Sequence, residues 1–405
     1  IASCLVGSEM CIRDSYRSHA RRSLPKFVFD YLEGGAEGES TLHANRADLE
    51  ALRLTTRCLR DTRDIDTSIE VFGQTWAMPY AIAPIGLCGL FRPDGDVMMS
   101  RAARGAGIPH VLSTASNSRI ETLPAGNPLQ WLQLYVMSQR SIAEQVVRRA
   151  RAQGFGALVL TVDVPVSGAR ERDVRNQFKV PFKPTSRLAL DVLQRPGWLW
   201  RLAKGGSPQF ANLVDGDEKP SAQTQAMLLS REMDRSLDWQ SLQWVRALWD
   251  GPLLIKGVLH PGDARMALAH GADGLIVSNH GGRQLDGAVS SISALQPILD
   301  AVADRIPVFV DGGFRRASDI VKALALGARG VFLGRPMAYG LASGGEAGVA
   351  SVIDLLRNEL RRNMILMGAN TIADITRDHL APNQPVFPRF DTCHEQTPRP
   401  PAHSF

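Results

Sequence analysis

The stretch IPVFVDGGFRRASDIVKALALGARGVFLGR, residues 306–335, contains a complete strand–helix–strand unit. Its two apolar runs, 306–311 and 330–335, are rich in Val, Phe and Leu and lack strict alternation with polar residues. This composition is typical of strands that are buried on both faces of a parallel sheet. Between them, a helical pattern begins near Asp319 and ends at Gly327, so the stretch predicts a β–α–β unit.

The same unit recurs along the chain. One helix between two such runs places Val146, Val147 and Ala150 on one face and ends at Gly154. Eight alternating units favour an α/β fold of the closed (β/α)8 TIM-barrel type over an open doubly wound sheet. The six further apolar runs are 80–84, 110–113, 129–135, 157–163, 253–256 and 274–280.

One connection is much longer than a crossover helix requires. The fourth run ends near Asp163 and the fifth begins near Leu253, so we expect an insertion at about 165–230, at the C-terminal mouth of the barrel. The barrel itself is predicted to span 21–385. The segments 1–20 and 386–405 are predicted to be tails, the first of them disordered or artefactual.

Composition limits the functional classes. The 405 residues are 44% hydrophobic and 21% charged, with a net charge of +5, as in an ordinary globular protein with a sizeable core. Five scattered cysteines without a C-x-x-C pair predict no disulfide framework or metal site and fit a reducing cytoplasm. No apolar run is long enough to cross a membrane, and no basic stripe or zinc-finger spacing indicates a nucleic-acid partner.

The last two strands end in glycine and arginine. Asp311, Gly312 and Gly313 are followed by Arg315, and the next strand ends at Gly334 and Arg335. Loops after strands seven and eight of such barrels commonly bind phosphate through backbone N–H groups that glycine exposes. Because the arginines would add charge-assisted hydrogen bonds, these two loops predict a phosphate site.

A histidine and an arginine follow the sixth strand, in Ser278-Asn-His-Gly-Gly-Arg283. A lone histidine is more often structural, but Arg283 offers a rigid fork for a carboxylate beside His280. His280 is therefore a candidate general base. Asp163, at the end of the fourth strand, is placed to stabilise the resulting imidazolium; a helix cap is the less favoured alternative.

Two further cations leave alternatives open. Lys256 ends the fifth strand, where it could form a Schiff base, as in barrel aldolases, or act as a fixed cation beside a ligand. Arg170 could be a second ligand for a carboxylate, or part of a solvated charge cluster with its neighbours. The residues themselves do not decide between these readings.

Taken together, these motifs resemble those of the FMN-dependent L-2-hydroxy acid dehydrogenases and oxidases, from about residue 24 to residue 380. Within that family, 84–89 and 168–170 are similar to bacterial quinone-linked L-lactate dehydrogenases, and 112–117 and 208–212 to (S)-mandelate dehydrogenase. The motifs that carry the resemblance are LPKFVFDY (24–31), GGA (34–36), QLY (133–135), TVD (161–163), KG (256–257), SNHGGRQLD (278–286) and DGGFR (311–315).

The resemblance implies a role for each matching position. His280 resembles the base and Asp163 its charge partner, while Arg283 and Arg170 resemble ligands of the substrate carboxylate. Lys256 resembles the lysine beside the flavin N1/O2 edge, which disfavours the aldolase reading. Other matching positions are Tyr31 and Tyr135 for substrate contact, Ala83, Pro84, Ile85, Ser113, Gln133 and Thr161 around the flavin ring, Asp311 at the ribityl chain, and Gly312, Gly313, Arg315, Gly334 and Arg335 at the phosphate.

The implied function is the FMN-dependent oxidation of an L-2-hydroxy acid, of the lactate or mandelate type, to the 2-oxo acid. Gly86 and Ala115 are small, which predicts room for a bulky substrate side chain. Electrons would pass to a quinone or an electron-transfer protein. One alternative is an oxidase that passes them to oxygen, and a more remote one is a lyase that forms a Schiff base through Lys256. The non-enzymatic alternative is a scaffold protein built on a barrel that has lost its activity.

The basic and apolar segment 181–204 predicts peripheral contact with the inner face of the cell membrane, although a lid or a subunit contact would give the same pattern. The resemblance also implies a homotetramer.

Overall fold

The computed structural model describes residues 15–176, 178, 186–205, 209–213 and 233–382. The expected C-terminal tail at 386–405, residues 1–14 of the expected N-terminal tail and part of the expected insertion therefore lie outside the described residues. Residues 15–20 are described, and Arg17 to Ala20 belong to the first helix, where Ala20 is fully buried, so the expectation of a disordered tail is wrong for this part. The described helices are α1 (Arg17–Ser23), α2 (Lys26–Glu33), α3 (Ser40–Ala51), α4 (Cys88–Phe91), α5 (Gly95–Ala106), α6 (Arg140–Ala152), α7 (Glu171–Arg175), α8 (Ser186–Leu193), α9 (Pro196–Gly205), α11 (Trp239–Leu248), α12 (Pro261–Ala269), α13 (Ser291–Val302), α14 (Ala317–Leu326) and α15 (Arg335–Met367).

Eight parallel strands close into a barrel in the order β10-β3-β4-β5-β6-β7-β8-β9, and the predicted (β/α)8 fold is confirmed. Each of these strands lies within, or within two residues of, one of the eight apolar runs, because strands buried on both faces keep a continuous apolar sequence. The barrel strands are β3 (Tyr80–Ile82), β4 (His110–Ser113), β5 (Gln130–Leu134), β6 (Ala157–Thr161), β7 (Leu253–Val258), β8 (Gly274–Val277), β9 (Val308–Val310) and β10 (Gly330–Leu333).

A hairpin of β1 (Ile69–Val71) and β2 (Gln74–Trp76), which the sequence patterns did not reveal, precedes the barrel. The ring of its buried Trp76 stacks on Phe309 of β9, with the ring centroids 5.6 Å apart. Trp131 and Phe332 pack against the same ring. These aromatic side chains fill the barrel interior, so the centre of the barrel is a packed core and not a pore.

Strand register brings the expected site residues together. Ser113 pairs with Gln133 between β4 and β5, and Thr161 pairs with Lys256 between β6 and β7. Because the strands are parallel, all these positions lie at the same C-terminal end of the barrel.

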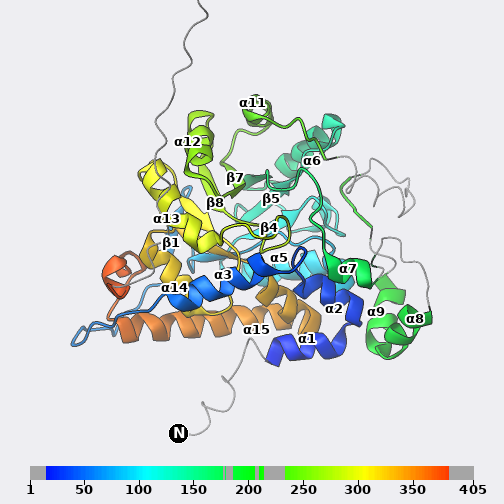
Figure 1. Cartoon of the computed structure of the whole chain (residues 1–405), viewed down its shortest axis with the longest axis horizontal. Coiled ribbons are helices and arrows are strands. Elements are labelled where there is room, and N and C mark those ends of the chain that lie inside the picture. The colour runs from blue at the N-terminus through cyan, green and yellow to red at the C-terminus, as the bar shows by residue number, and fades with distance from the viewer. Residues whose placement is uncertain (1–14, 177, 179–185, 206–208, 214–232, 383–405) are drawn as a thin grey trace, which may run out of the picture.

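The segment between β6 and β7 contains α7, α8 and α9, which lie together on one side of the barrel, next to α2 (Figure 1). α15 is the longest of the described helices and packs along α1 and α5, with a kink at Gly345. Among the described residues, no helix combines the length and apolarity needed to cross a bilayer.

Candidate active site

A cavity opens at the C-terminal end of the barrel, where nearly all of the expected site residues meet. Asp163 is the exception, since it stands behind His280 and does not line the cavity. Residues that the sequence analysis did not select also line it, including Leu32, Phe91 and Phe332. The expected residues along the cavity are Tyr31, Ala83, Pro84, Ile85, Gly86, Ser113, Ala115, Gln133, Tyr135, Thr161, Arg170, Lys256, His280, Arg283, Asp311, Gly312, Gly313, Arg315, Gly334 and Arg335.

His280 is held between a carboxylate and a phenol. Its Nδ1 lies 2.9 Å from Asp163 Oδ1, and its Nε2 lies 3.4 Å from the Tyr135 hydroxyl. A carboxylate only accepts hydrogen bonds, so Nδ1 carries the proton and Nε2 presents a lone pair toward the cavity. The backbone of His280 has a φ of 57°, a left-handed conformation that few non-glycine residues adopt and that is found at functional sites.

Asp163 is buried, yet its pKa is lowered. Burial by itself would raise the pKa of this carboxyl, but the neighbouring His280 and Lys256 outweigh that effect. Asp163 is therefore held as a carboxylate, and within the part of the chain that the structure describes its Oδ2 has no hydrogen-bond partner. This arrangement can stabilise positive charge on the imidazole.

Lys256 is buried beside Asp311 and Ser278. Its Nζ lies 3.1 Å from Asp311 Oδ2 and donates to Ser278 Oγ at 2.8 Å. Burial would lower the pKa of Lys256, but the carboxylates of Asp311 and Asp163 more than compensate, and the net pKa is raised. A Schiff-base lysine needs the opposite shift, since it must lose its proton to attack a carbonyl. The geometry therefore favours a fixed cation.

Two arginines that line the cavity, Arg283 and Arg170, lie against the same Tyr31 ring, an arrangement that can hold an anion. Arg283 donates through Nη1 to the carbonyls of Tyr31, at 2.7 Å, and Gly34, at 2.8 Å, which orients its guanidinium. Burial and the nearby Arg170 lower the pKa of Arg283, because a positive charge is unfavourable away from water and beside another cation. An anion bound to both arginines would offset this unfavourable free energy. Arg170 Nε lies 3.0 Å from Asp173 Oδ2, an ion pair that lacks the alignment of a hydrogen bond.

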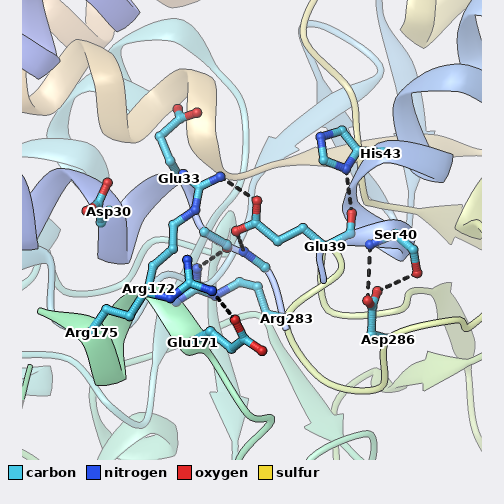
Figure 2. A network of polar contacts seen from close by, with 12 residues as sticks. Asp30, Glu33, Glu39, Ser40, His43, Glu171, Arg172, Arg175, Arg283 and Asp286 are labelled. Atoms are coloured by element: carbon cyan, nitrogen blue, oxygen red, sulfur yellow. Dashed lines mark hydrogen bonds and ion pairs between the residues drawn. The ribbon is translucent and has the colours of Figure 1, made fainter. Parts of the chain in front are cut away.

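The segment that carries the accepting carbonyls is fixed by a polar network (Figure 2). Glu39 accepts from the Gly35 N–H at 2.9 Å and pairs with Arg172 of α7. In the same network, Asp286, in the loop after β8, accepts from the Ser40 hydroxyl at 2.8 Å. The network thus ties the start of α3 to both α7 and the loop of His280.

A close approach of backbones in this region also requires glycine. Gly282 has a φ of 74°, and a Cβ there would lie 2.6 Å from the Leu42 nitrogen. A side chain at this position would be strained and would collide with α3. The glycine pair after His280 thus allows its loop to pack against α3.

Close to Arg283, with which it shares the Gly34 carbonyl as an acceptor, Arg335 forms the centre of a cationic group. It donates to the carbonyls of Leu32, Gly34 and Gly281. Its burial, together with the like charges of Arg315 and Arg283, lowers its pKa. Buried cations that repel one another are the expected environment for a multiply charged anion such as a phosphate.

Comparisons with known proteins agree with this geometry. The pattern of the family described as FMN-dependent dehydrogenase matches residues 20–382. The L-lactate dehydrogenase of Ectopseudomonas mendocina (strain ymp) is 44% identical over 368 residues, which cover 90% of this chain and 97% of that protein.

Two solved structures extend the comparison. The crystal structure of the monotopic membrane protein (S)-mandelate dehydrogenase is 44% identical, with a TM-score of 0.87, and covers 91% of this chain and 98% of that chain. A mandelate oxidase solved with (S)-4-hydroxymandelic acid is 38% identical, with a TM-score of 0.77, and covers 91% of this chain and 97% of that chain.

Proposed function

This chain belongs to the family of FMN-dependent dehydrogenases and oxidises L-2-hydroxy acids, and we propose that His280 is its general base. The observation that carries the proposal is the orientation of one ring. His280 Nδ1 is occupied by Asp163, while Nε2 faces a cavity that Arg283 and Arg170 line.

The residues of the cavity fit FMN. Three buried polar atoms along it, Gln133 Nε2, Thr161 Oγ1 and Asp311 Oδ1, have no hydrogen-bond partner among the described residues. Gln133 Oε1 already accepts from Ser113 Oγ at 3.0 Å, so its amide N–H groups are left for a ligand. Orphaned buried polar atoms are costly, and a polar ring edge and a ribityl chain would satisfy them.

We assign the FMN phosphate to the loops of Gly313 and Gly334, with Arg315 and Arg335 supplying positive charge. Lys256 would be the cation beside the flavin ring. FMN, when bound, would accept the two electrons and one of the two protons that the substrate loses as its alcohol carbon becomes a carbonyl, which leaves the other proton for a base.

The remaining work falls to side chains of this chain. Arg283 and Arg170 hold the substrate carboxylate and thereby fix the α-carbon relative to His280. His280 Nε2 accepts a proton from the substrate, and Asp163 stabilises the imidazolium that results. Tyr135, whose hydroxyl lies 3.4 Å from Nε2, is placed to contact the reacting oxygen.

The substrate side chain would lie against Gly86 and Ala115. A Cβ added to Gly86 would stand 3.3 Å from the Cβ of Ala115 and 3.7 Å from the Tyr31 hydroxyl, so a larger residue would take space from the ligand. We therefore propose a substrate of the L-lactate or (S)-mandelate type, whose side chain occupies the space that Gly86 and Ala115 leave.

For the acceptor, we propose a quinone or an electron-transfer protein at the inner face of the cell membrane. α8 and α9 expose Leu190, Leu193 and Trp200 at 60%, 67% and 64%, and Lys204 Nζ lies 4.7 Å from the Trp200 ring. Apolar and Trp side chains beside cations are typical of helices that lie in a lipid interface. The similarity to a monotopic membrane protein supports the same placement.

The similarity to a mandelate oxidase makes oxygen the second candidate acceptor. Stopped-flow reoxidation of the reduced enzyme separates the two: rapid reaction with a soluble quinone and slow reaction with dissolved oxygen is the expected result. The homotetramer stays a prediction, which light scattering of the purified protein would check.

The base assignment is tested by anaerobic bleaching of the flavin with L-lactate, glycolate and (S)-mandelate. His280→Ala is expected to bind FMN as the unaltered protein does and to lose reduction by every substrate. A His280→Ala protein that is reduced rapidly would refute the assignment.

A further inference from the structure

The segment between β6 and β7 packs against the outside of the substrate cavity. We define the side-chain wall as Tyr31, Gly86, Phe91 and Ala115, all of which line the cavity. Phe178 and Trp198 belong to the β6–β7 segment and do not line the cavity, but each contacts an element that carries part of this wall.

The first contact is a stack of rings behind Tyr31. The Phe178 ring lies 4.9 Å from the Tyr31 ring with an interplanar angle of 16°. The guanidinium carbon of Arg283 lies 4.9 Å from the same Tyr31 ring. Tyr31 thus packs against both the substrate-binding arginine and a residue of the β6–β7 segment, so a change at Phe178 would alter its position.

The second contact involves Trp198 of α9, which is 4% exposed. Its indole N–H donates to the carbonyl of Leu90 at 2.7 Å, next to Phe91 of the side-chain wall. Its ring meets the Phe27 ring edge-on at 6.0 Å, and Phe27 lies 6.1 Å from Phe178. Trp198 therefore supports the side-chain wall in two places. It contacts Leu90, next to Phe91, and it reaches Tyr31 through the packed rings of Phe27 and Phe178.

The third contact follows α9 in the chain. The Asn117 amide donates to the carbonyl of Gln209 at 2.8 Å and accepts from the Gly89 N–H at 2.8 Å. The Ala211 N–H donates to Ser116, next to Ala115, at 3.0 Å. The loops of Gly86 and Ala115 are thus joined to each other and to the β6–β7 segment.

We propose that Trp198 and Phe178 are positioning residues that decide which substrate side chain the cavity accepts. The inference rests on the proposed function, because it assumes that the substrate side chain meets this wall. Close-packed side chains relax only partly when a neighbour is removed, so loss of either ring would shift the wall. A substrate without a side chain would not sense that shift.

The test compares (S)-mandelate, L-lactate and glycolate with the holoenzyme and with Trp198→Phe, Trp198→Leu and Phe178→Leu. We expect kcat/KM for (S)-mandelate to change about tenfold or more in the leucine variants, because small displacements at a reacting site have effects of that size. For glycolate, kcat/KM should change less than about threefold. Trp198→Phe, which keeps a smaller aromatic ring and loses the N–H, should give an intermediate effect.

Trp200→Leu is the matched control, since this tryptophan lies on the same helix and is 64% exposed. It should leave the ratio of kcat/KM for (S)-mandelate to that for glycolate unchanged. Equal loss of kcat/KM for every substrate, or no change in the ratio, would overturn the inference. Flavin content of each purified variant shows that the barrel has folded.

A binding measurement separates this inference from the proposed function. The dissociation constants of phenylglyoxylate and glyoxylate are obtained from the change in flavin absorbance and need no turnover. If no hydroxy acid reduces the flavin but the ratio of these constants still shifts in Trp198→Leu, the proposed function fails and the positioning role holds. If turnover is normal and the ratio is constant, the positioning role fails alone.

Discussion

Replacement of Asp163 by Asn should slow reduction of the flavin by substrate far more than it weakens binding. The substitution keeps the shape of the side chain and removes the charge that lies beside His280, where Asp163 Oδ1 stands 2.9 Å from Nδ1. With an effective dielectric constant of about 20 and charge centres ~4 Å apart, the lost attraction for the imidazolium is about 4 kcal/mol. That energy corresponds to a ~10³-fold slower reduction step.

The assay is anaerobic stopped-flow bleaching of the flavin under saturating L-lactate or (S)-mandelate. Asp286→Asn is the matched control, because it removes a carboxylate from the same loop as His280 but one that binds Ser40 and Thr41. The control should reduce within a few-fold of the unaltered rate, and both variants should retain FMN. A reduction rate in Asp163→Asn within about tenfold of the unaltered enzyme would refute the charge-stabilisation argument.

Three further predictions follow from single contacts. Arg335→Met should raise the dissociation constant of FMN by at least about tenfold, because it removes a cation from the assigned phosphate site. Fluorescence titration of the apoprotein with FMN measures this constant. An unchanged constant would place the phosphate elsewhere. Burial lowers the pKa of His110 to about 4, below its ordinary value of about 6.5. The contribution of the neutral His110 to the free energy of unfolding should therefore be complete above pH 6.5, and about 3 kcal/mol of it should be lost as the pH falls to 4. Urea unfolding across that range should show this loss, and a His110→Gln protein with the same pH dependence would contradict the assignment. The double variant Leu193→Ser, Trp200→Ser should no longer sediment with anionic vesicles. Leu366→Ser on α15, whose side chain is similarly exposed, should sediment as before. Equal vesicle binding by all variants would exclude α8 and α9 as the membrane contact.

The fold was predictable because its signals are local. A strand buried on both faces needs a short continuous apolar run, and a helix between two such strands needs a pattern of period 3.6, so each unit is readable without the others. Gly327, for example, ends α14 with a φ of 111°, as its place in the sequence indicates. The β1–β2 hairpin was missed because its strands, IEV and QTW, contain polar residues and form no continuous apolar run, whereas the equally short β3 and β9 lie within one.

The candidate site was only partly predictable. The end of each strand is a local feature, so Lys256, His280 and Asp311 could be selected from sequence. The contacts of Phe178 and Trp198 could not, because both residues lie in a long connection whose path over the barrel is not a local property. The sequence shows Trp198 and Trp200 two positions apart in an amphipathic pattern, which does not tell which of the two rings is buried or what it contacts.

The sequence by itself determined that eight strand–helix units close a barrel and that charged residues and glycines stand at the strand ends. Only the tertiary structure decided which of them act together. Asp163 and His280 are 117 residues apart in the chain, and their 2.9 Å contact exists because barrel closure brings the ends of β6 and β8 to the same mouth. In the same way, the ion pair with Asp311 decided that Lys256 is held as a cation, since the pKa of a buried amine depends on neighbours that the sequence does not place.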